Sequence, residues 1–226
     1  MGTNQVWGMV ERAAPARGFD TNVVVTAEVA RKFAVDGYRF CVRYVSHDQA
    51  EGQYDISRGE AETILGANLA LMVVQHVRRS GWSPTAALGS SDGALAAQHL
   101  AGMGAPPRLT VWTDIEGLTS DVPAAAIIAY ANAWYTAVAA AGYTPGLYVG
   151  TFRLTSSQLY WNLKFRNYWK SGMAVADVER RGYQMIQQSP GNVTMNGIHI
   201  DNDVVQADNL GDLPTWWVGS SEVATS

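Results

Sequence analysis

Two carboxylates separated by one residue, Asp114 and Glu116, stand at the end of the apolar run 109–113. If this run is a β-strand, successive side chains alternate between its faces, so both carboxylates project to the same side. Two neighbouring acids in an apolar setting are costly unless their charge is used or neutralised. Unequal surroundings would separate their pKa values, which suits one acid to donate a proton and the other to stabilise positive charge.

An isolated Asp-x-Glu is a common tripeptide, so the rest of the chain has to support this interpretation. Apolar runs alternate along the chain with segments of helical periodicity. We expect strands over residues 18–20, 38–45, 69–75, 109–116, 146–150, 167–170, 183–188 and 197–201. We expect helices over residues 26–36, 60–67, 91–103 and about 121–141, and a further helix beginning near 155–158. Strands that alternate with helices in this way indicate a parallel sheet.

The acids favour a closed barrel over an open sheet. No Gly-x-Gly-x-x-Gly or phosphate loop follows an early strand, so the signature of a nucleotide-binding open sheet is missing. Asp20, Asp114 with Glu116, and Asp201 all stand at the carboxyl ends of predicted strands. In a (β/α) barrel these ends converge on one mouth, where catalytic groups gather.

Composition excludes several classes of function. The 226 residues are 47% hydrophobic, which is enough for one substantial core. The net charge of -4, with no more than two consecutive Lys or Arg, argues against a nucleic-acid or anionic-membrane partner. No apolar run is long enough to span a membrane. Residues 1–17 lack the apolar block of a signal peptide, so action at a cell wall would need another export or release route.

Other chemistries find little support in the sequence, and we expect no cofactor. The four histidines show no short zinc-type pairing, and no Gly-x-Ser-x-Gly elbow is present. The single cysteine, Cys41, lies in a β-rich run and reads as a core residue. Four carboxylates offer the oxygen ligands that Mg²⁺ and Ca²⁺ prefer, so a metal-dependent phosphoesterase stays open as an alternative.

Five segments occur in the order seen in one enzyme family: 18–20, 114–116, 146–150, 183–188 and 197–203. In this order the chain resembles the lysozyme-type glycoside hydrolases of family 25. It resembles even more closely their bacterial relative, a glycoside-hydrolase-like domain of unknown function. The resemblance implies an irregular (β/α) TIM-type barrel with fewer than eight helices over residues 18–212, a leader over 1–17 and a tail over 213–226. It also implies cleavage of β-1,4 bonds in the peptidoglycan glycan.

The same resemblance implies roles for individual acids. Glu116 matches the general acid, Asp114 the carboxylate beside it, and Asp20 the acid on the first strand. Asp201 matches the acid on the last strand. We prefer it to Asp203, which falls where the lysozyme pattern usually has Asn.

Aromatic residues near the acids are candidates for sugar contacts. Tyr148 and Trp169 stand at strand ends, Trp112 shares the strand face of the acids, and Tyr44 ends another strand. Aromatic rings stack on sugar faces, although packing is the ordinary role of such residues. The sequence therefore predicts a peptidoglycan hydrolase, with a non-catalytic glycan-binding barrel as the alternative. The stereochemical outcome and the oligomeric state stay open.

Overall fold

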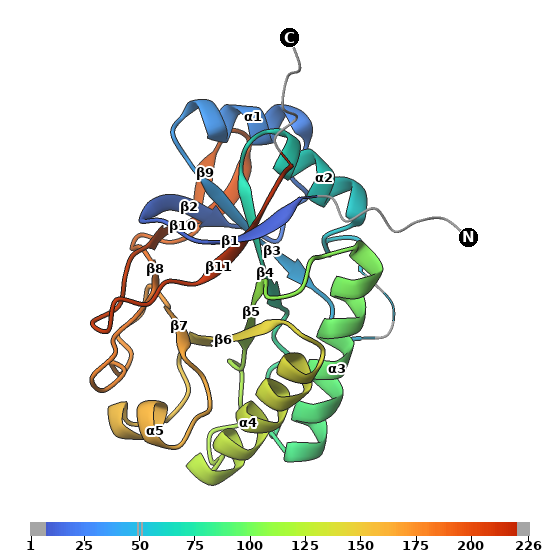
Figure 1. Cartoon of the computed structure of the whole chain (residues 1–226). Coiled ribbons are helices and arrows are strands. Elements are labelled where there is room, and N and C mark those ends of the chain that lie inside the picture. The colour runs from blue at the N-terminus through green and yellow to red at the C-terminus, as the bar shows by residue number, and fades with distance from the viewer. Residues whose placement is uncertain (1–7, 49, 51, 221–226) are drawn as a thin grey trace.

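Eight strands close into a barrel in the computed structural model, which describes residues 8–48, 50 and 52–220. The barrel strands are β2 (Ala16–Asp20), β3 (Phe40–Val45), β4 (Ala70–Gln75), β5 (Thr110–Asp114), β6 (Thr144–Val149), β7 (Asn167–Lys170), β8 (Met185–Gln187) and β10 (Ile198–Val205). Their order around the barrel is β4-β3-β2-β10-β8-β7-β6-β5, and β5 pairs with β4 to close the ring (Figure 1).

Five helices surround the barrel in the described part of the chain: α1 (Ala27–Val35), α2 (Arg58–Gly66), α3 (Ala86–Met103), α4 (Ala124–Ala140) and α5 (Ser156–Trp161). Gly89 and Gly93 let α3 and α4 pack closely. A Cβ on Gly89 would lie 2.2 Å from the carbonyl oxygen of Tyr130, and a Cβ on Gly93 would lie 2.7 Å from that of Trp134. None of these helices combines the length and the hydropathy that a bilayer crossing requires. The expected α/β fold, an irregular barrel with fewer than eight helices, is confirmed.

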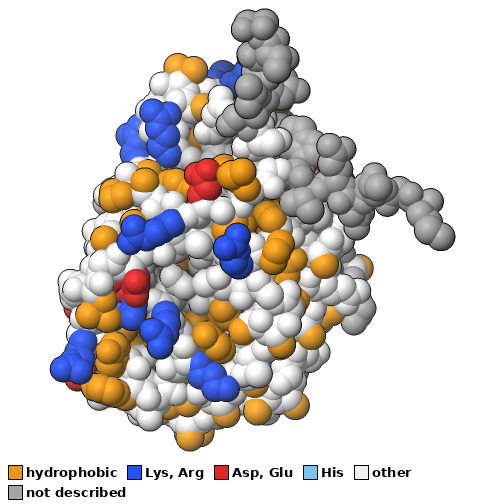
Figure 2. Space-filling model, viewed as in Figure 1, with side chains coloured by type: hydrophobic (Ala, Val, Ile, Leu, Met, Phe, Trp, Pro, Cys, Tyr) orange, Lys and Arg blue, Asp and Glu red, His pale blue; other side chains and the backbone are white. Residues whose placement is uncertain are grey.

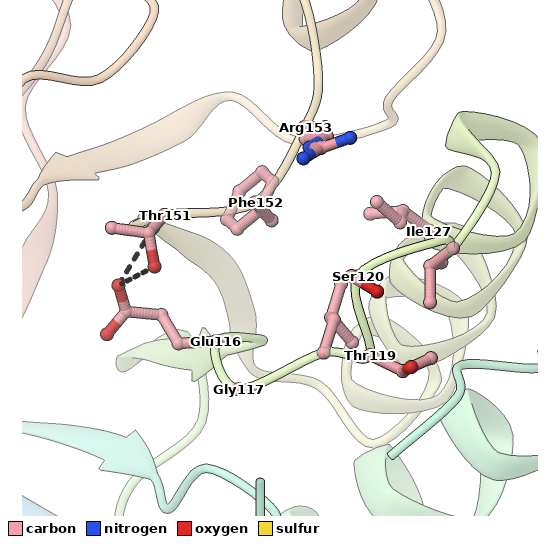
Figure 3. Close-up of a pocket in the computed structure, with 10 residues that line it drawn as sticks. Glu116, Gly117, Thr119, Ser120, Ile127, Thr151, Phe152 and Arg153 are labelled. Carbon is pink, nitrogen blue, oxygen red and sulfur yellow. Dashed lines mark hydrogen bonds between the residues drawn. The ribbon is translucent and has the colours of Figure 1, made fainter. Parts of the chain in front are cut away.

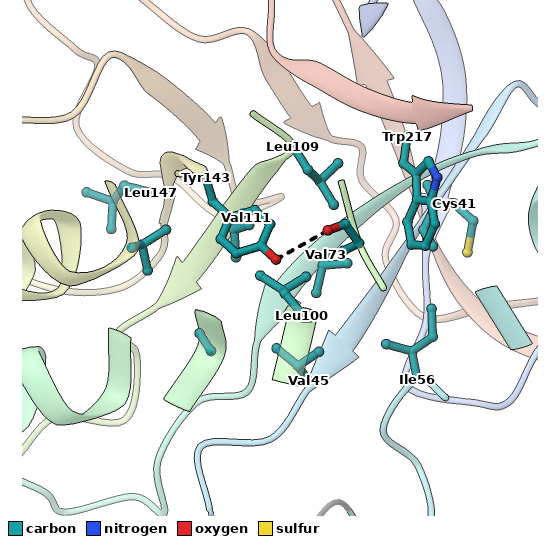
Figure 4. Close-up of a cluster of buried hydrophobic side chains, with 14 of the residues drawn as sticks. Cys41, Val45, Ile56, Val73, Leu100, Leu109, Val111, Tyr143, Leu147 and Trp217 are labelled. Atoms are coloured by element: carbon teal, nitrogen blue, oxygen red, sulfur yellow. Dashed lines mark hydrogen bonds between the residues drawn. The ribbon is translucent and has the colours of Figure 1, made fainter. Parts of the chain in front are cut away.

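Alternation along the strands divides the core into two parts. Inward side chains such as Val42, Met72 and Trp112 fill the barrel. Outward side chains pack under the helices in a larger cluster, which includes Leu100 and Leu147 (Figure 4). The acids at the strand ends therefore stand on a packed barrel interior, as in other (β/α) barrels.

The amino-terminal end of the barrel is covered by two strands outside the ring. β1 (Met9–Arg12) pairs antiparallel with β11 (Thr215–Val218), and β11 pairs with β4. Trp216 packs inside the barrel against Phe40, with ring centroids 6.1 Å apart, while Trp217 enters the outer core (Figure 4). This end is closed by aromatic packing, so access to the barrel is from the opposite end.

One strand differs from the expectation. We expected the strand 197–201 to run parallel to the others with Asp201 at its carboxyl end, and this was wrong. β10 extends to Val205 and runs antiparallel to both β2 and β8. The physical reason is the short connection 188–197, which holds only the small strand β9 (Val193–Met195), because parallel neighbours need a crossover of a dozen or more residues. Asp201 reaches the mouth from the first half of the strand.

Candidate active site

All four predicted acids lie together at the open end of the barrel. Asp20 is the last residue of β2, and the antiparallel register places Asp201 directly opposite it on β10. Asp114 ends β5, and Glu116 follows two residues later. A cavity of about 190 Å³ opens between these elements, lined by Tyr44, Val74, Asp114, Glu116, Tyr148, Trp169, Gln187 and Asp201.

The side-chain amide of Gln187 joins Asp20 to Asp201. Its Nε2 donates to Asp20 Oδ2 at 3.1 Å and to Asp201 Oδ2 at 3.0 Å. Its Oε1 accepts from the Tyr148 hydroxyl at 3.0 Å and from the backbone N–H of Gly172 at 3.1 Å. These two donors to Oε1 fix the amide orientation, so that its N–H groups face the carboxylates.

Burial and mutual repulsion raise the pKa values of two aspartates at this strand pair. Burial first, and then the charge of Asp201, raise the pKa of Asp20 to about 6, although the Tyr44 hydroxyl donates to it at 2.9 Å. Asp203 lies deeper and is fully buried, and its Oδ1 accepts from the Trp169 indole N–H at 2.9 Å. Burial and the charge of Asp20 raise the pKa of Asp203 well above its usual value, which favours its protonated form.

The acids on the β5 side are held by backbone groups. Asp114 Oδ1 accepts from the backbone N–H of Glu116 at 2.8 Å. Burial, followed by the charge of Glu116, raises the pKa of Asp114 to about 7. Glu116 Oε1 accepts from the backbone N–H of Thr151 at 2.8 Å and from its hydroxyl at 3.2 Å (Figure 3). Gly150 leaves room for this carboxylate, because a Cβ there would lie 2.1 Å from Oε1.

A second loop fixes the backbone at Glu116. The Trp82 indole N–H donates to the Glu116 carbonyl oxygen at 2.8 Å. Residues 81–82 also pair with the segment after β5, through a bond from Gly81 N–H to Gly117 O at 2.7 Å and one from Thr119 N–H to Trp82 O at 3.0 Å. Glu116 therefore stands on a braced turn, although it lies beyond the end of its strand.

The predicted aromatic residues divide into two groups. Tyr44, Tyr148 and Trp169 line the cavity. Trp112 does not: its side chain is fully buried, with its ring centroid 5.9 Å from that of Trp169. The strand alternation that places Trp112 on the same face as Asp114 also places it one layer deeper in the barrel, where it packs and has no access to a ligand.

Two further cavities adjoin the central one. One of about 180 Å³ shares Tyr44 and Asp201 with it and also borders Asp20 and His199. The other, of about 230 Å³, shares Glu116 and extends between the segments that follow β5 and β6 (Figure 3). The three cavities form a row across the mouth, a shape that suits an extended ligand.

Among the described residues, no group of three or more His, Cys, Asp or Glu side chains is placed to hold a metal ion.

His76 stands just past the end of β4, where its Nε2 lies 3.0 Å from Asp55 Oδ1 and its ring lies 4.7 Å from that of Tyr44. Burial lowers the pKa of His76, which favours its neutral form beside Tyr44.

The sequence matches a known family. The profile of the Rv2525c-like, glycoside hydrolase-like domain matches residues 31–205. The chain belongs to this family. Among curated proteins, none matches the sequence significantly.

Solved structures show the same fold. The Mycobacterium tuberculosis Tat-secreted protein Rv2525c, in complex with L-tartrate, has a TM-score of 0.66 at 16% identity, over 88% of this chain and 99% of that one. A muramidase from Acremonium alcalophilum has a TM-score of 0.57 at 13% identity, covering 85% and 94%. The modular autolysin LytC from Streptococcus pneumoniae, in complex with a synthetic peptidoglycan ligand, has a TM-score of 0.57 at 11% identity, covering 85% and 47%. The chain thus has a glycoside-hydrolase-like fold related to muramidases and endolysins.

Several residues of the site were missed by sequence reasoning. Gln187 stood within the recognised segment 183–188 and had no assigned role, and Thr151 had no signal at all. Gly150 ended a recognised segment, but its contact with Glu116 depends on how β5 and β6 lie side by side. Only the three-dimensional register shows that a small residue is required there.

Proposed function

We propose that this protein is a glycoside hydrolase that cleaves β-1,4 linkages in the glycan of bacterial peptidoglycan. The proposal depends on one observation: Asp114, Glu116 and Asp201 line one cavity, Asp20 borders the cavity next to it, and no Lys or Arg among the described residues lines either. Neighbouring carboxylates without cationic partners lower the stability of the fold, because their charges repel and are poorly solvated. Glycosidic cleavage is a reaction that uses such a group of carboxylates. The muramidase fold and the row of cavities support a polysaccharide substrate.

Glycosidic cleavage needs a proton for the leaving oxygen and negative charge facing an oxocarbenium-like transition state. We assign proton donation to Glu116, because Thr151 holds Oε1 and leaves Oε2 for the ligand. Asp114, whose pKa is raised to about 7, is partly protonated beside Glu116 at neutral pH. Asp201 supplies the negative charge on the opposite side of the cavity, and Asp20 stands beside it, bonded to the same Gln187 amide.

A site of action at the cell wall follows from this substrate. The structurally similar Mycobacterium tuberculosis protein is Tat-secreted, which supports export for this chain as well. Detection of the protein in the culture medium or in the wall fraction of its native cell would test this.

The main test is dye release from purified peptidoglycan. Glu116→Gln should lower the rate by about 10²–10⁴-fold, the usual contribution of general acid–base catalysis. Glu62→Gln, the same change on α2 away from the mouth, should leave the rate unchanged. Equal activity of the Glu116→Gln and wild-type proteins would rule out this assignment.

Gly150→Ala tests the placement of the same carboxylate without removing it. The new Cβ would displace Glu116 from Thr151, and a shift of about 1 Å can lower a rate by about 10²-fold. Gly102→Ala on α3, where a Cβ meets open space, is the matched control and should keep full activity.

A non-catalytic glycan-binding barrel is the second candidate. It is favoured by the three aromatic side chains that line the central cavity, Tyr44, Tyr148 and Trp169, since such rings can hold a sugar without any catalytic step. If wild-type protein sediments with purified cell walls and releases no soluble sugar, and if Glu116→Gln and Asp114→Asn sediment equally, the binding function replaces the hydrolase proposal.

A further inference from the structure

The two ends of the barrel differ in charge. The acids Asp20 and Asp114 stand at the carboxyl ends of β2 and β5, at the mouth. Exposed arginines stand at the opposite, amino-terminal end: Arg12 at the end of β1, Arg17 in β2, Arg39 immediately before β3, Arg108 two residues before β5 and Arg166 immediately before β7. The net charge of -4, which argued against an anionic partner, is therefore an average over two unlike ends.

The arginines of the amino-terminal end are neighbours in space. The backbone N–H of Arg39 donates to the carbonyl oxygen of Arg17 at 2.8 Å. Arg12 lies opposite Thr215 in the register of β1 and β11, and the Thr215 hydroxyl donates to the carbonyl oxygen of Arg108 at 2.5 Å. Figure 2 shows Lys and Arg side chains spread over the face that β1 and β11 cross in Figure 1, with few acids among them.

These arginines are available to a partner. Within the described residues, none of the five takes part in an ion pair. Exposed acids on the neighbouring segments are Glu11, Asp36 and Asp212, and Asp212 is already paired with Arg181 at 2.8 Å. The positive charge of this end is therefore only partly balanced by the protein itself.

Arg108 adopts a backbone conformation that is unusual for arginine. Its φ is 70°, in the left-handed region, where residues other than Gly, Asn and Asp are uncommon. Among the described residues, three of the four other non-glycine positions of this kind hold Asn, at 68, 192 and 196. An exposed arginine that is kept where Asn would fold at lower cost points to a use for its side chain.

Exposed apolar side chains stand beside the same arginines. Met9, on β1 with Arg12, is 56% exposed. Leu210, 52% exposed, adjoins the carbonyl group that accepts from Arg12 at 2.6 Å. Val35, 87% exposed, ends α1 one residue before the carbonyl group that accepts from Arg17. Cations mixed with exposed apolar groups are typical of a surface that binds at the interface of an anionic bilayer, whereas a soluble polyanion would leave the apolar groups in water.

We propose that the amino-terminal end of the barrel is a docking surface for an anionic phospholipid bilayer. The arginines bind lipid phosphates, and Met9, Val35 and Leu210 enter the boundary between headgroups and acyl chains. Because this end lies opposite the mouth, a docked molecule presents its acids away from the bilayer. For an exported protein this orientation turns the mouth toward the cell wall. The inference goes beyond the proposed hydrolysis and does not depend on it.

Cosedimentation of the full chain with lipid vesicles tests the docking. We expect binding to vesicles of equal parts phosphatidylglycerol and phosphatidylcholine, and little binding to phosphatidylcholine alone. Added salt should weaken the binding, because it screens charges at a surface. Equal binding to the two kinds of vesicle, or no binding to those with phosphatidylglycerol, would overturn the inference.

A pair of substitutions assigns the binding to the amino-terminal end. Arg39→Gln with Arg108→Asn should lower the vesicle partition coefficient about 25-fold, roughly fivefold for each arginine. Asn suits the backbone of residue 108, so the loss cannot come from unfolding. The matched control is Arg58→Gln with Arg79→Gln, which changes the net charge equally at two exposed arginines near the mouth, and it should bind fully. Equal losses in the two pairs would contradict the assigned surface.

A fluorescent label tests whether the apolar groups enter the lipid. Cys41 is buried, so a cysteine introduced at the surface can be labelled selectively. With an environment-sensitive dye, Leu210→Cys should show a blue shift on phosphatidylglycerol vesicles. Tyr54→Cys should show none, because Tyr54 is 56% exposed in the loop after β3, at the mouth end.

Two outcomes of the labelling experiment would overturn the inference. Equal shifts at the two positions would remove the orientation. Binding to inorganic polyphosphate with no shift of the Leu210→Cys label on vesicles would identify a soluble polyanion as the partner. Dye release from peptidoglycan is measured without vesicles, so the hydrolase proposal stands or fails separately.

Discussion

Buried acids outside the barrel and buried acids inside it have opposite surroundings. Outside the barrel, three buried carboxylates each have an arginine partner: Glu60 pairs with Arg43, Asp92 with Arg78, and Asp208 with Arg181. Inside the barrel mouth, the buried Asp20 and Asp203 have only Tyr, Gln and Trp donors and one another. Asp114 has a backbone N–H.

The Arg43–Glu60 pair shows how many hydrogen bonds a buried ion pair outside the barrel makes. Arg43 is fully buried on the outer face of β3, and its Nε lies 2.6 Å from Glu60 Oε1. Its remaining donors reach the carbonyl oxygens of Thr21 at 2.6 Å and Tyr54 at 2.9 Å. Glu60 Oε1 also accepts from the Val25 N–H at 2.8 Å. The pair joins the segments after β2 and β3 to α2.

The difference separates structural acids from functional ones. A paired buried acid connects elements, whereas burial without a cationic partner raises the pKa values of Asp20, Asp114 and Asp203. Nothing in the packing of β2, β5 or β10 requires acids at these positions. Their clustering supports the function that we propose for the mouth, and the difference between the two groups of acids can be tested through stability alone.

The largest expected effect comes from breaking the Arg43–Glu60 pair. Glu60→Gln leaves the buried Arg43 charge without its counter-charge, which should lower the free energy of unfolding by about 3–5 kcal/mol. Urea unfolding at pH 7, followed by tryptophan fluorescence, measures this. Replacing both partners with apolar residues (Arg43→Met with Glu60→Leu) should recover most of the loss. If Glu60→Gln lowers the free energy of unfolding by less than about 1 kcal/mol, the paired acids outside the barrel do not differ from the unpaired acids at the mouth.

The next effect is a pH dependence caused by the unpaired acids. The pKa values of Asp114 and Asp20 are raised to about 7 and about 6, so the folded protein binds more protons than the unfolded chain between pH 4 and 7. Their contribution to stability is therefore present below about pH 4 and is lost as the pH rises through these values. Asp114→Asn should reduce this loss by about 2 kcal/mol, since Asp114 is partly open to the cavity.

Unfolding curves at pH 4 and pH 8 check this, with the exposed Asp121→Asn as control. A wild-type protein that gains stability from pH 4 to pH 8, with Asp114→Asn behaving identically, would contradict the raised pKa values.

The sequence predicted the local elements well, because hydrophobic period and capping are local signals. The strand 167–170 was placed at its observed bounds, and the capping box of Thr155 and Gln158 forms both of its bonds. The similar pattern Ser57–Glu60 forms only half a box. Ser57 accepts from the Glu60 N–H, while the Glu60 carboxylate turns to Arg43, a contact between distant segments that no local pattern encodes. The helix α4 was expected to begin near residue 121, but it begins after Pro123.

The sequence was enough to predict which acids form the candidate site. It was not enough to predict which side chains contact these acids and hold them in place. Strand ends converge in any barrel, so the meeting of Asp20, Asp114, Glu116 and Asp201 could be expected. The bridging role of Gln187 depends on the antiparallel direction of β10, which the sequence did not reveal. The catalytic roles of the four acids stay predictions until activity is measured.

The smallest effect, and the sharpest contrast, is expected at Asp203. Because burial and Asp20 raise the pKa of Asp203 and favour its protonated form, Asp203→Asn removes no favoured charge and keeps an acceptor for the Trp169 N–H. The free energy of unfolding at pH 6 should change by less than about 0.5 kcal/mol, the scale of a neutral substitution. The same change at Asp92, which is equally buried but accepts from Arg78 and Tyr130, should cost about 1–3 kcal/mol. Equal costs at the two positions would mean that Asp203 is charged in the folded protein, and the distinction between the acids inside the barrel and those outside it would fail.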